Sequence, residues 1–323
     1  MLIDMPLEKL REYRGRSPRP QNFDRYWEES LAELDEVKPD ITLTPAREFS
    51  APNAECLDLF FTGVGGARVH AKVLRPKVRR GAAPAVVMFH GYHSDSGKWY
   101  NRLAYVNAGF TVAALDCRGQ FGGSEDNLQT RGITVRGHIL RGVDDPDPKK
   151  LLFRYNYLDT VELTRIVMEL DGVDPDRIGI TGVSQGGGLS YACAALEPRV
   201  NRCLAVYPFL SDFRRVWEMD LAKGAYQELT DYFRWRDPLH EREEEFFERL
   251  GYIDIQNLAP RIRCQFRMFT ALMDTTCPPS TQFAAYNKIG SADKRVRIWY
   301  DHKHEDLPHG DDMTYMYMME MAQ

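Results

Sequence analysis

The 323-residue sequence has no closely spaced cysteine pair and no long apolar run. Its six cysteines are scattered without a C-x-x-C pair, so we expect free thiols in a reducing compartment rather than a zinc site or a disulfide framework. No apolar stretch is long enough to span a bilayer. The first 16 residues, MLIDMPLEKLREYRGR, lack the apolar core of a secretory signal. We therefore expect a cytoplasmic protein with no membrane partner.

An excess of charge of one sign is also missing. The net charge is -5, with 28% charged residues, and no basic stripe suggests a nucleic-acid partner. No internal repeat or low-complexity tract is visible, and no motif calls for a cofactor or a metal. Hydrophobic residues make up 43% of the chain, which is enough for one large domain or two ordinary ones.

Six apolar runs rich in β-branched residues dominate the sequence. Near-continuous runs of this kind are typical of strands buried on both faces of a parallel sheet. The predicted strands are 85–91, 111–119, 177–182, 202–209, 264–274 and 295–301. Helix-like segments separate most of them, and the clearest are 159–170, 186–196 and 281–289. This alternation predicts an α/β layered domain.

The remaining segments are less regular. Apolar residues at three- and four-residue spacing predict a helix over 22–36, within an N-terminal helical extension of residues 1–50. Two alternating runs, 55–61 and 68–76, predict an antiparallel hairpin or meander. Two stretches do not fit the alternation, and we expect insertions at 120–157 and 210–258 in a single domain of residues 1–323.

One serine stands in a pattern that carries chemistry. Gly182-Val183-Ser184-Gln185-Gly186 reads G-x-S-x-G, directly after a predicted strand and before a small-residue helix. Such a turn exposes a serine hydroxyl at the edge of a sheet. A glycine-rich turn without chemistry is the alternative. The hydroxyl needs an adjacent base to become a nucleophile, so the rest of the chain decides.

Candidate partners follow in the order expected for this kind of turn, first an acid and then a histidine. Asp274 closes a late predicted strand, where a simple turn or cap residue is the alternative. After the last predicted strand come His302, His304 and His309, and spacing alone does not separate His302 from His304. We interpret three of the earlier histidines as structural or exposed: His70, His138 and His240.

Two backbone N–H groups are needed to hold the oxyanion of an ester under attack. One is expected from Gln185, the residue after the serine. The other is expected from Tyr92, in the loop that follows the strand at 85–91.

Together these residues resemble the acetyl xylan esterase / cephalosporin C deacetylase family, carbohydrate esterase family seven of the α/β-hydrolase superfamily. The resemblance covers nearly the whole chain from the FDRYW segment onward, and RGQ and SQGGG are its characteristic motifs. The matching stretches are FHGY (89–92), RGQ (118–120), GHILRG (137–142), GVSQGGG (182–188), YPFLSDF (207–213), FAAYN (283–287) and HE (304–305).

The resemblance implies an α/β-hydrolase fold, a mostly parallel twisted sheet with helices on both faces. It implies a triad of Ser184, Asp274 and His304, because the match at Glu305 favours His304 over His302 even though Lys303 replaces the family's usual glycine. The implied oxyanion donors are the main chains of Tyr92 and Gln185. The RGQ residues near the active-site floor are implied as scaffold: Arg118, Gly119 and Gln120.

The resemblance also implies a function. We expect hydrolysis of small acetyl esters of sugars, such as acetylated xylo-oligosaccharides, through an acyl-serine, with cephalosporin C also accepted and no cofactor. The family suggests a homohexamer, with 120–157 as a contact region. Alternatives are a broader carboxylesterase or peptidase-like hydrolase, and a non-catalytic binding protein, against which the intact triad argues. Five aromatic residues are candidates for a wall that binds a sugar, but we expect each of them to belong to the hydrophobic core instead: Trp99, Tyr100, Tyr207, Phe209 and Trp217.

Overall fold

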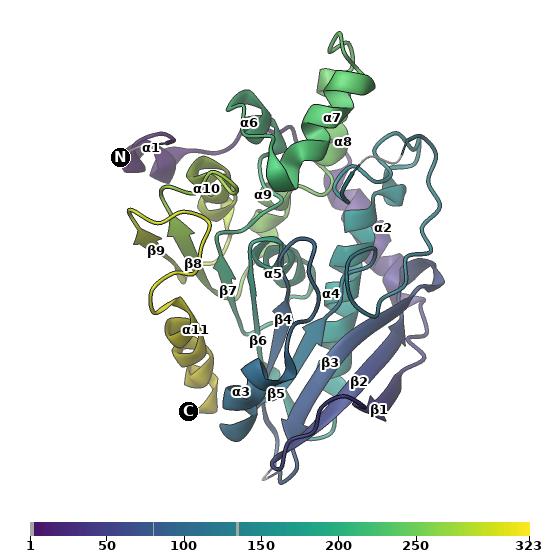
Figure 1. Cartoon of the computed structure of the whole chain (residues 1–323), viewed down its shortest axis with the longest axis vertical. Coiled ribbons are helices and arrows are strands. Elements are labelled where there is room, and N and C mark those ends of the chain that lie inside the picture. The colour runs from purple at the N-terminus through teal and green to yellow at the C-terminus, as the bar shows by residue number, and fades with distance from the viewer. Residues whose placement is uncertain (1–2, 80, 134–135) are drawn as a thin grey trace.

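The computed structural model describes residues 3–79, 81–133 and 136–323, in which nine strands form one sheet (Figure 1). The strands are β1 (Thr42–Pro45), β2 (Ala54–Thr62), β3 (Arg68–Pro76), β4 (Ala83–Phe89), β5 (Thr111–Leu115), β6 (Val173–Val183), β7 (Arg202–Val206), β8 (Gln265–Ala271) and β9 (Lys294–Trp299). Their order across the sheet is β1-β2-β3-β5-β4-β6-β7-β8-β9. The pairs from β1 to β5 are antiparallel, and those from β5 to β9 are parallel. The prediction of a mostly parallel sheet is confirmed.

Helices cover both faces of the sheet, as predicted (Figure 1). They are α1 (Leu7–Glu12), α2 (Phe23–Asp35), α3 (Leu103–Asn107), α4 (Leu152–Glu169), α5 (Gln185–Leu196), α6 (Phe213–Glu218), α7 (Gln227–Trp235), α8 (Glu243–Leu250), α9 (Ile255–Leu258), α10 (Pro279–Lys288) and α11 (Gly310–Met319). Successive residues of a strand point to opposite faces. Accordingly Val87 of β4 joins the larger core, with α2, α4 and α5. Its neighbour Val86 joins a smaller core, with α3 and α11.

Several predicted boundaries shift. The strands predicted at 111–119 and 264–274 end at Leu115 and Ala271, and the residues that follow turn away to build loops. Helix α4 begins at Leu152, inside the predicted first insertion, because residues 151–164 are buried without interruption. The N-terminal extension is not helical throughout, since Thr42–Pro45 pairs with β2 as an edge strand.

The two predicted insertions differ in character. The second, 210–258, contains α6, α7, α8 and α9, and the described part of the first is irregular up to α4 except for a 3₁₀ helix at Pro148–Lys150. Residues 134 and 135 of the first insertion, like residues 1 and 2 of the N-terminal extension, lie outside the described residues. In Figure 1, α7 and α8 stand at one end of the sheet. Among the described residues, no helix combines the length and the apolar character that crossing a membrane requires.

Candidate active site

Ser184 occupies the turn between β6 and α5. Its backbone has φ 58° and ψ −116°, a conformation that a non-glycine residue adopts only when its surroundings enforce it. The flanking glycines make the turn possible. A Cβ on Gly182 would collide with the backbone of Gly186, and a Cβ on Gly186 would collide with the carbonyl of Phe89. The G-x-S-x-G spacing is therefore a packing requirement of this turn.

His304 lies against Ser184. Its Nε2 is 3.0 Å from the serine Oγ, and its Nδ1 is 2.8 Å from Oδ2 of Asp274. A carboxylate accepts hydrogen bonds, so Nδ1 carries the proton and Nε2 is left to accept from the serine hydroxyl. Folding thus joins three residues in one hydrogen-bonded chain that can take the proton from Oγ.

Asp274 is fully buried in the turn that follows β8. While Oδ2 faces His304, Oδ1 accepts hydrogen bonds from the backbone N–H groups of Thr276 and Cys277, both at 2.8 Å. Both oxygens therefore have donors, which fixes the carboxylate in the orientation that holds the imidazole.

His302 and His304, which sequence spacing does not distinguish, make different contacts. The backbone carbonyl of His302 accepts from Met273 N at 3.0 Å, whereas the ring of His304 bonds to Ser184 and Asp274. Lys303, at the family's glycine position, has no positive φ, so a lysine fits there without strain. Its N–H donates to the Glu305 side chain at 2.9 Å.

A buried thiol, which the sequence analysis did not single out, adjoins the triad. Ligand atoms of Asp274, Cys277 and His304 lie within 4.8 Å of one another, a donor set that zinc can take. The atoms do not fit a metal site well, however. Asp274 and His304 already bond to each other, and burial raises the pKa of the Cys277 thiol well above its usual value.

The predicted oxyanion donors come from two separate segments. Gln185 is the first residue of α5, so its backbone N–H has no partner within the helix. Tyr92 lies in the loop after β4. Gln120 connects the two segments: its Nε2 donates to Oε1 of Gln185 at 2.7 Å, and its Oε1 accepts from His93 N at 2.9 Å. A residue of the RGQ motif therefore braces the chain beside both donors.

Arg118 is buried below this loop. Its guanidinium makes two 2.6 Å bonds to the carboxylate of Asp159 on α4 and donates to the carbonyl of Val64 at 2.8 Å. Gly119 follows with φ 73°. These contacts attach the RGQ turn to α4 and to the β2–β3 connection, which fits the scaffold role that was predicted.

Glu228 of α7 is a neighbour of the site that sequence reasoning missed. It is 2% exposed, and its Oε1 accepts from the Tyr92 hydroxyl at 2.9 Å. The same carboxylate accepts from backbone N–H groups of the first insertion: His138 at 3.1 Å, Ile139 at 2.9 Å and Leu140 at 2.8 Å. No local motif marks this glutamate, because its partners lie about 90 and 136 residues away.

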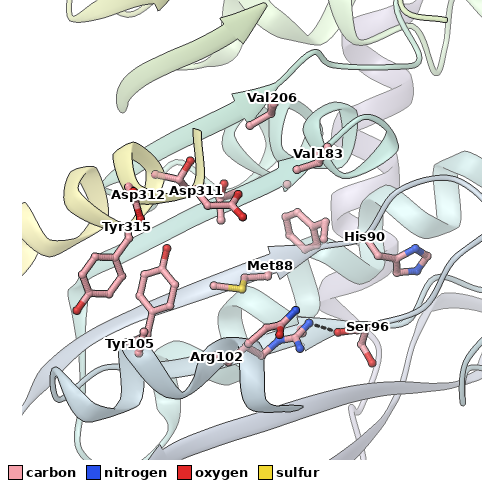
Figure 2. Close-up of a pocket in the computed structure, with 17 residues that line it drawn as sticks. Met88, His90, Ser96, Arg102, Tyr105, Val183, Val206, Asp311, Asp312 and Tyr315 are labelled. Carbon is pink, nitrogen blue, oxygen red and sulfur yellow. Dashed lines mark hydrogen bonds between the residues drawn. The ribbon is translucent and has the colours of Figure 1, made fainter. Parts of the chain in front are cut away.

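A cavity of about 630 Å³ lies between α3 and α11, next to the nucleophile turn (Figure 2). Val183 and Val206 line it, with Arg102 and Tyr105 on one wall and Asp311 on another. Neither Ser184 nor His304 contributes to its lining, so this cavity does not mark where the acyl group binds.

The five aromatic residues are mixed in their exposure. Phe209 and Tyr207 are buried, as expected of core residues, and the Tyr207 ring packs 4.4 Å from the His304 ring, centroid to centroid. Tyr100 is 59% exposed, and Trp99 and Trp217 are half-buried. Tyr207 is thus the member that contacts the triad.

The fold of the whole chain is similar to those of two solved acetyl xylan esterases. The structure matches acetyl xylan esterase 1 from Thermoanaerobacterium sp. JW/SL YS485 with a TM-score of 0.96 and 53% identity, over 99% of this chain and 100% of that one. It matches an acetyl xylan esterase from Paenibacillus sp. R4 with a TM-score of 0.92 and 32% identity, over 98% and 99% of the two chains.

A curated relative, acetyl esterase Axe7A of Xylanibacter ruminicola, is 26% identical over 87% of this chain, which spans 62% of that protein's length. The family model for acetyl xylan esterase (AXE1) matches residues 1–321. With an α/β-hydrolase fold and a match over almost its whole length, the chain belongs to the acetyl xylan esterase family.

Proposed function

We propose that this protein is a serine esterase that removes acetyl groups from sugars such as acetylated xylo-oligosaccharides. The hydrogen-bonded chain from Ser184 through His304 to Asp274 is the observation that carries the proposal. Membership of the acetyl xylan esterase family supports the choice of acyl group and alcohol.

The reaction follows from the roles proposed for these residues. Nε2 of His304 takes the proton of Ser184 as Oγ attacks the ester carbonyl carbon, and the N–H groups of Tyr92 and Gln185 hold the oxyanion. The imidazolium then gives its proton to the departing alcohol oxygen, which leaves an acetyl-serine. Water attacks this ester in the same way, releasing acetate and regenerating the serine. Asp274 stabilises the imidazolium in both halves.

A Ser184→Ala variant tests the proposal. We expect release of acetate from acetylated xylo-oligosaccharides, and of 4-nitrophenol from 4-nitrophenyl acetate, to fall by several orders of magnitude with the thermal midpoint nearly unchanged. Retained hydrolysis would exclude the serine mechanism. A folded wild-type protein with no hydrolysis of any ester tested would favour a binding protein instead.

A series of 4-nitrophenyl esters tests the acyl preference. An acetyl specialist loses kcat/KM steeply from acetyl to butyryl, whereas a similar rate across the series would identify a general short-chain carboxylesterase. Cephalosporin C belongs in the same panel as a small acetyl ester.

We also propose a cytoplasmic homo-oligomer, and a hexamer in particular. Six cysteines that form no disulfides fit a reducing compartment. The hexamer rests on the family resemblance. Light scattering after size-exclusion chromatography measures the mass directly, and a monomeric mass at micromolar concentration would refute the oligomer. Cell fractionation tests the location.

A further inference from the structure

The buried carboxylate of Glu228 accepts four hydrogen bonds. Its carboxylate accepts from the Tyr92 hydroxyl and from three consecutive backbone N–H groups, those of His138, Ile139 and Leu140. Every one of these partners is a donor toward Glu228. The arrangement therefore suits an acceptor with several lone pairs, which is the ionised carboxylate.

Burial makes this arrangement costly unless the donors stay in place. The side chain of Glu228 has almost no contact with solvent, and burial raises its pKa to about 7 even though the four donors act in the opposite direction. A buried carboxylate is retained only where its hydrogen bonds are satisfied. Moving any one of the three segments that meet here would take at least one donor away from the buried carboxylate.

Tyr92 is the member of this cluster to which the proposed mechanism gives a role at the reacting atoms. Its hydroxyl donates to Glu228 and accepts from His138 N at 2.8 Å, so the ring is held at its far end by both insertions. Its backbone N–H is the oxyanion donor proposed above. The ring and the amide belong to one residue, so a constraint on the hydroxyl also constrains the amide.

We propose that Glu228 is a positioning residue for the oxyanion hole, acting through the hydroxyl of Tyr92. Together with the 138–140 turn, it fixes the loop after β4 so that the Tyr92 N–H points at the developing oxyanion. This inference rests on the proposed esterase function and extends it to a residue on α7, outside the hydrolase sheet.

The test compares Glu228→Gln, Tyr92→Phe and the double variant on 4-nitrophenyl acetate. Glutamine keeps the shape but presents an NH₂ group to N–H donors, and phenylalanine removes only the hydroxyl. An oxyanion donor acts more strongly in the transition state than in the ground state. We therefore expect each single variant to lower kcat roughly 10-fold with KM changed less than about twofold. The double variant should be no worse than the poorer single one, because both changes break the same connection.

Asp144→Asn is the matched control. Asp144 also joins the first insertion to the α7 segment, accepting from Tyr232 at 3.3 Å and from Arg236 at 3.2 Å, and its side chain is 5% exposed. Among the described residues, Asp144 has no hydrogen bond to Tyr92. If Glu228 acts on catalysis, Asp144→Asn keeps kcat within about twofold of the wild type.

Three results would overturn the proposal: an unchanged kcat in Glu228→Gln, equal losses of kcat in Glu228→Gln and Asp144→Asn, or losses that multiply in the double variant. Should Glu228→Gln fail to fold, Tyr92→Phe decides, and a wild-type kcat there refutes the inference. Hydrolysis retained by Ser184→Ala would instead overturn the proposed function, so the two failures are distinguishable.

Discussion

Arg118 and Asp159 form a bidentate ion pair that is almost completely shielded from water. Both nitrogen–oxygen distances are 2.6 Å, and the two side chains are 2% and 1% exposed. The pair joins the RGQ turn to α4. Because a charge left alone in such a place has no water to solvate it, loss of one partner costs far more than loss of a surface pair.

We expect Arg118→Ala to lower the free energy of unfolding by about 3–5 kcal/mol. Denaturant unfolding measures the change. The control is Arg25→Ala, which breaks the exposed Arg25–Glu29 pair on α2 and should leave the free energy of unfolding nearly unchanged. Equal losses in the two variants would contradict the scaffold role of Arg118.

Gln120→Leu tests the brace between the two oxyanion segments. Leucine has a similar size but removes the bonds to Gln185 and to His93 N. We expect kcat on 4-nitrophenyl acetate to fall by roughly 10-fold, equivalent to about 1.4 kcal/mol, with a smaller effect on KM. A rise in KM with unchanged kcat would assign Gln120 to substrate binding instead.

The choice between His304 and His302 is tested by paired alanine variants. His304→Ala removes the base that faces Ser184, so kcat should fall by several orders of magnitude. His302→Ala removes a ring and leaves the backbone carbonyl that accepts from Met273 N, so most activity should remain. The opposite ranking would refute the proposed triad.

His70 makes stability depend on pH. It lies between two carboxylates, with Nδ1 2.6 Å from Asp116 Oδ2 and Nε2 3.0 Å from Asp58 Oδ1. Burial lowers the pKa of His70, but the bonds to Asp116 and Asp58 outweigh burial, so its pKa in the folded state is raised. The charged ring therefore contributes stability fully below its unfolded pKa of about 6.5, and this contribution is lost as pH rises through the folded pKa.

His70→Gln should accordingly destabilise the protein more at pH 5.5 than at pH 9. Urea unfolding of both proteins at the two pH values gives the comparison. Asp116 stays ionised across this range: burial acts to raise its pKa, but the bonds from His70 and two backbone N–H groups outweigh burial and lower the pKa to about 2. A pH-independent difference would show that the pKa of His70 is the same in the folded and unfolded states, which would refute the raised pKa.

Much of the parallel sheet could be predicted because its signal is local. The runs that became β4, β6 and β7 are apolar on both faces, and burial on both faces requires that composition. Ser184 was recognisable because its turn requires glycine at 182 and 186. Asp274 could be predicted because it follows the end of a strand and stands between the serine and the histidine in the chain order that this fold imposes.

Other features depend on contacts that no local pattern encodes. Spacing alone left His302 and His304 equivalent, and the direction of each ring is a property of the folded loop. Strand β1 has little apolar character and exists because β2 offers it a pairing edge. Glu228 reads as an ordinary acidic residue at the start of a helix, and its partners come from two distant segments.

The position of β9 at the margin of the sheet has a consequence for how activity is lost. In the described part of the chain, β9 pairs with β8 alone, and His304 follows the last residue of β9 by five residues. If β9 separated from β8, the imidazole of His304 would move away from the site, while the hydroxyl of Ser184 and the rest of the molecule stayed in place. Mild denaturant should then abolish activity before the main unfolding transition. Loss of turnover would report local unfolding of β9 at the edge of the sheet.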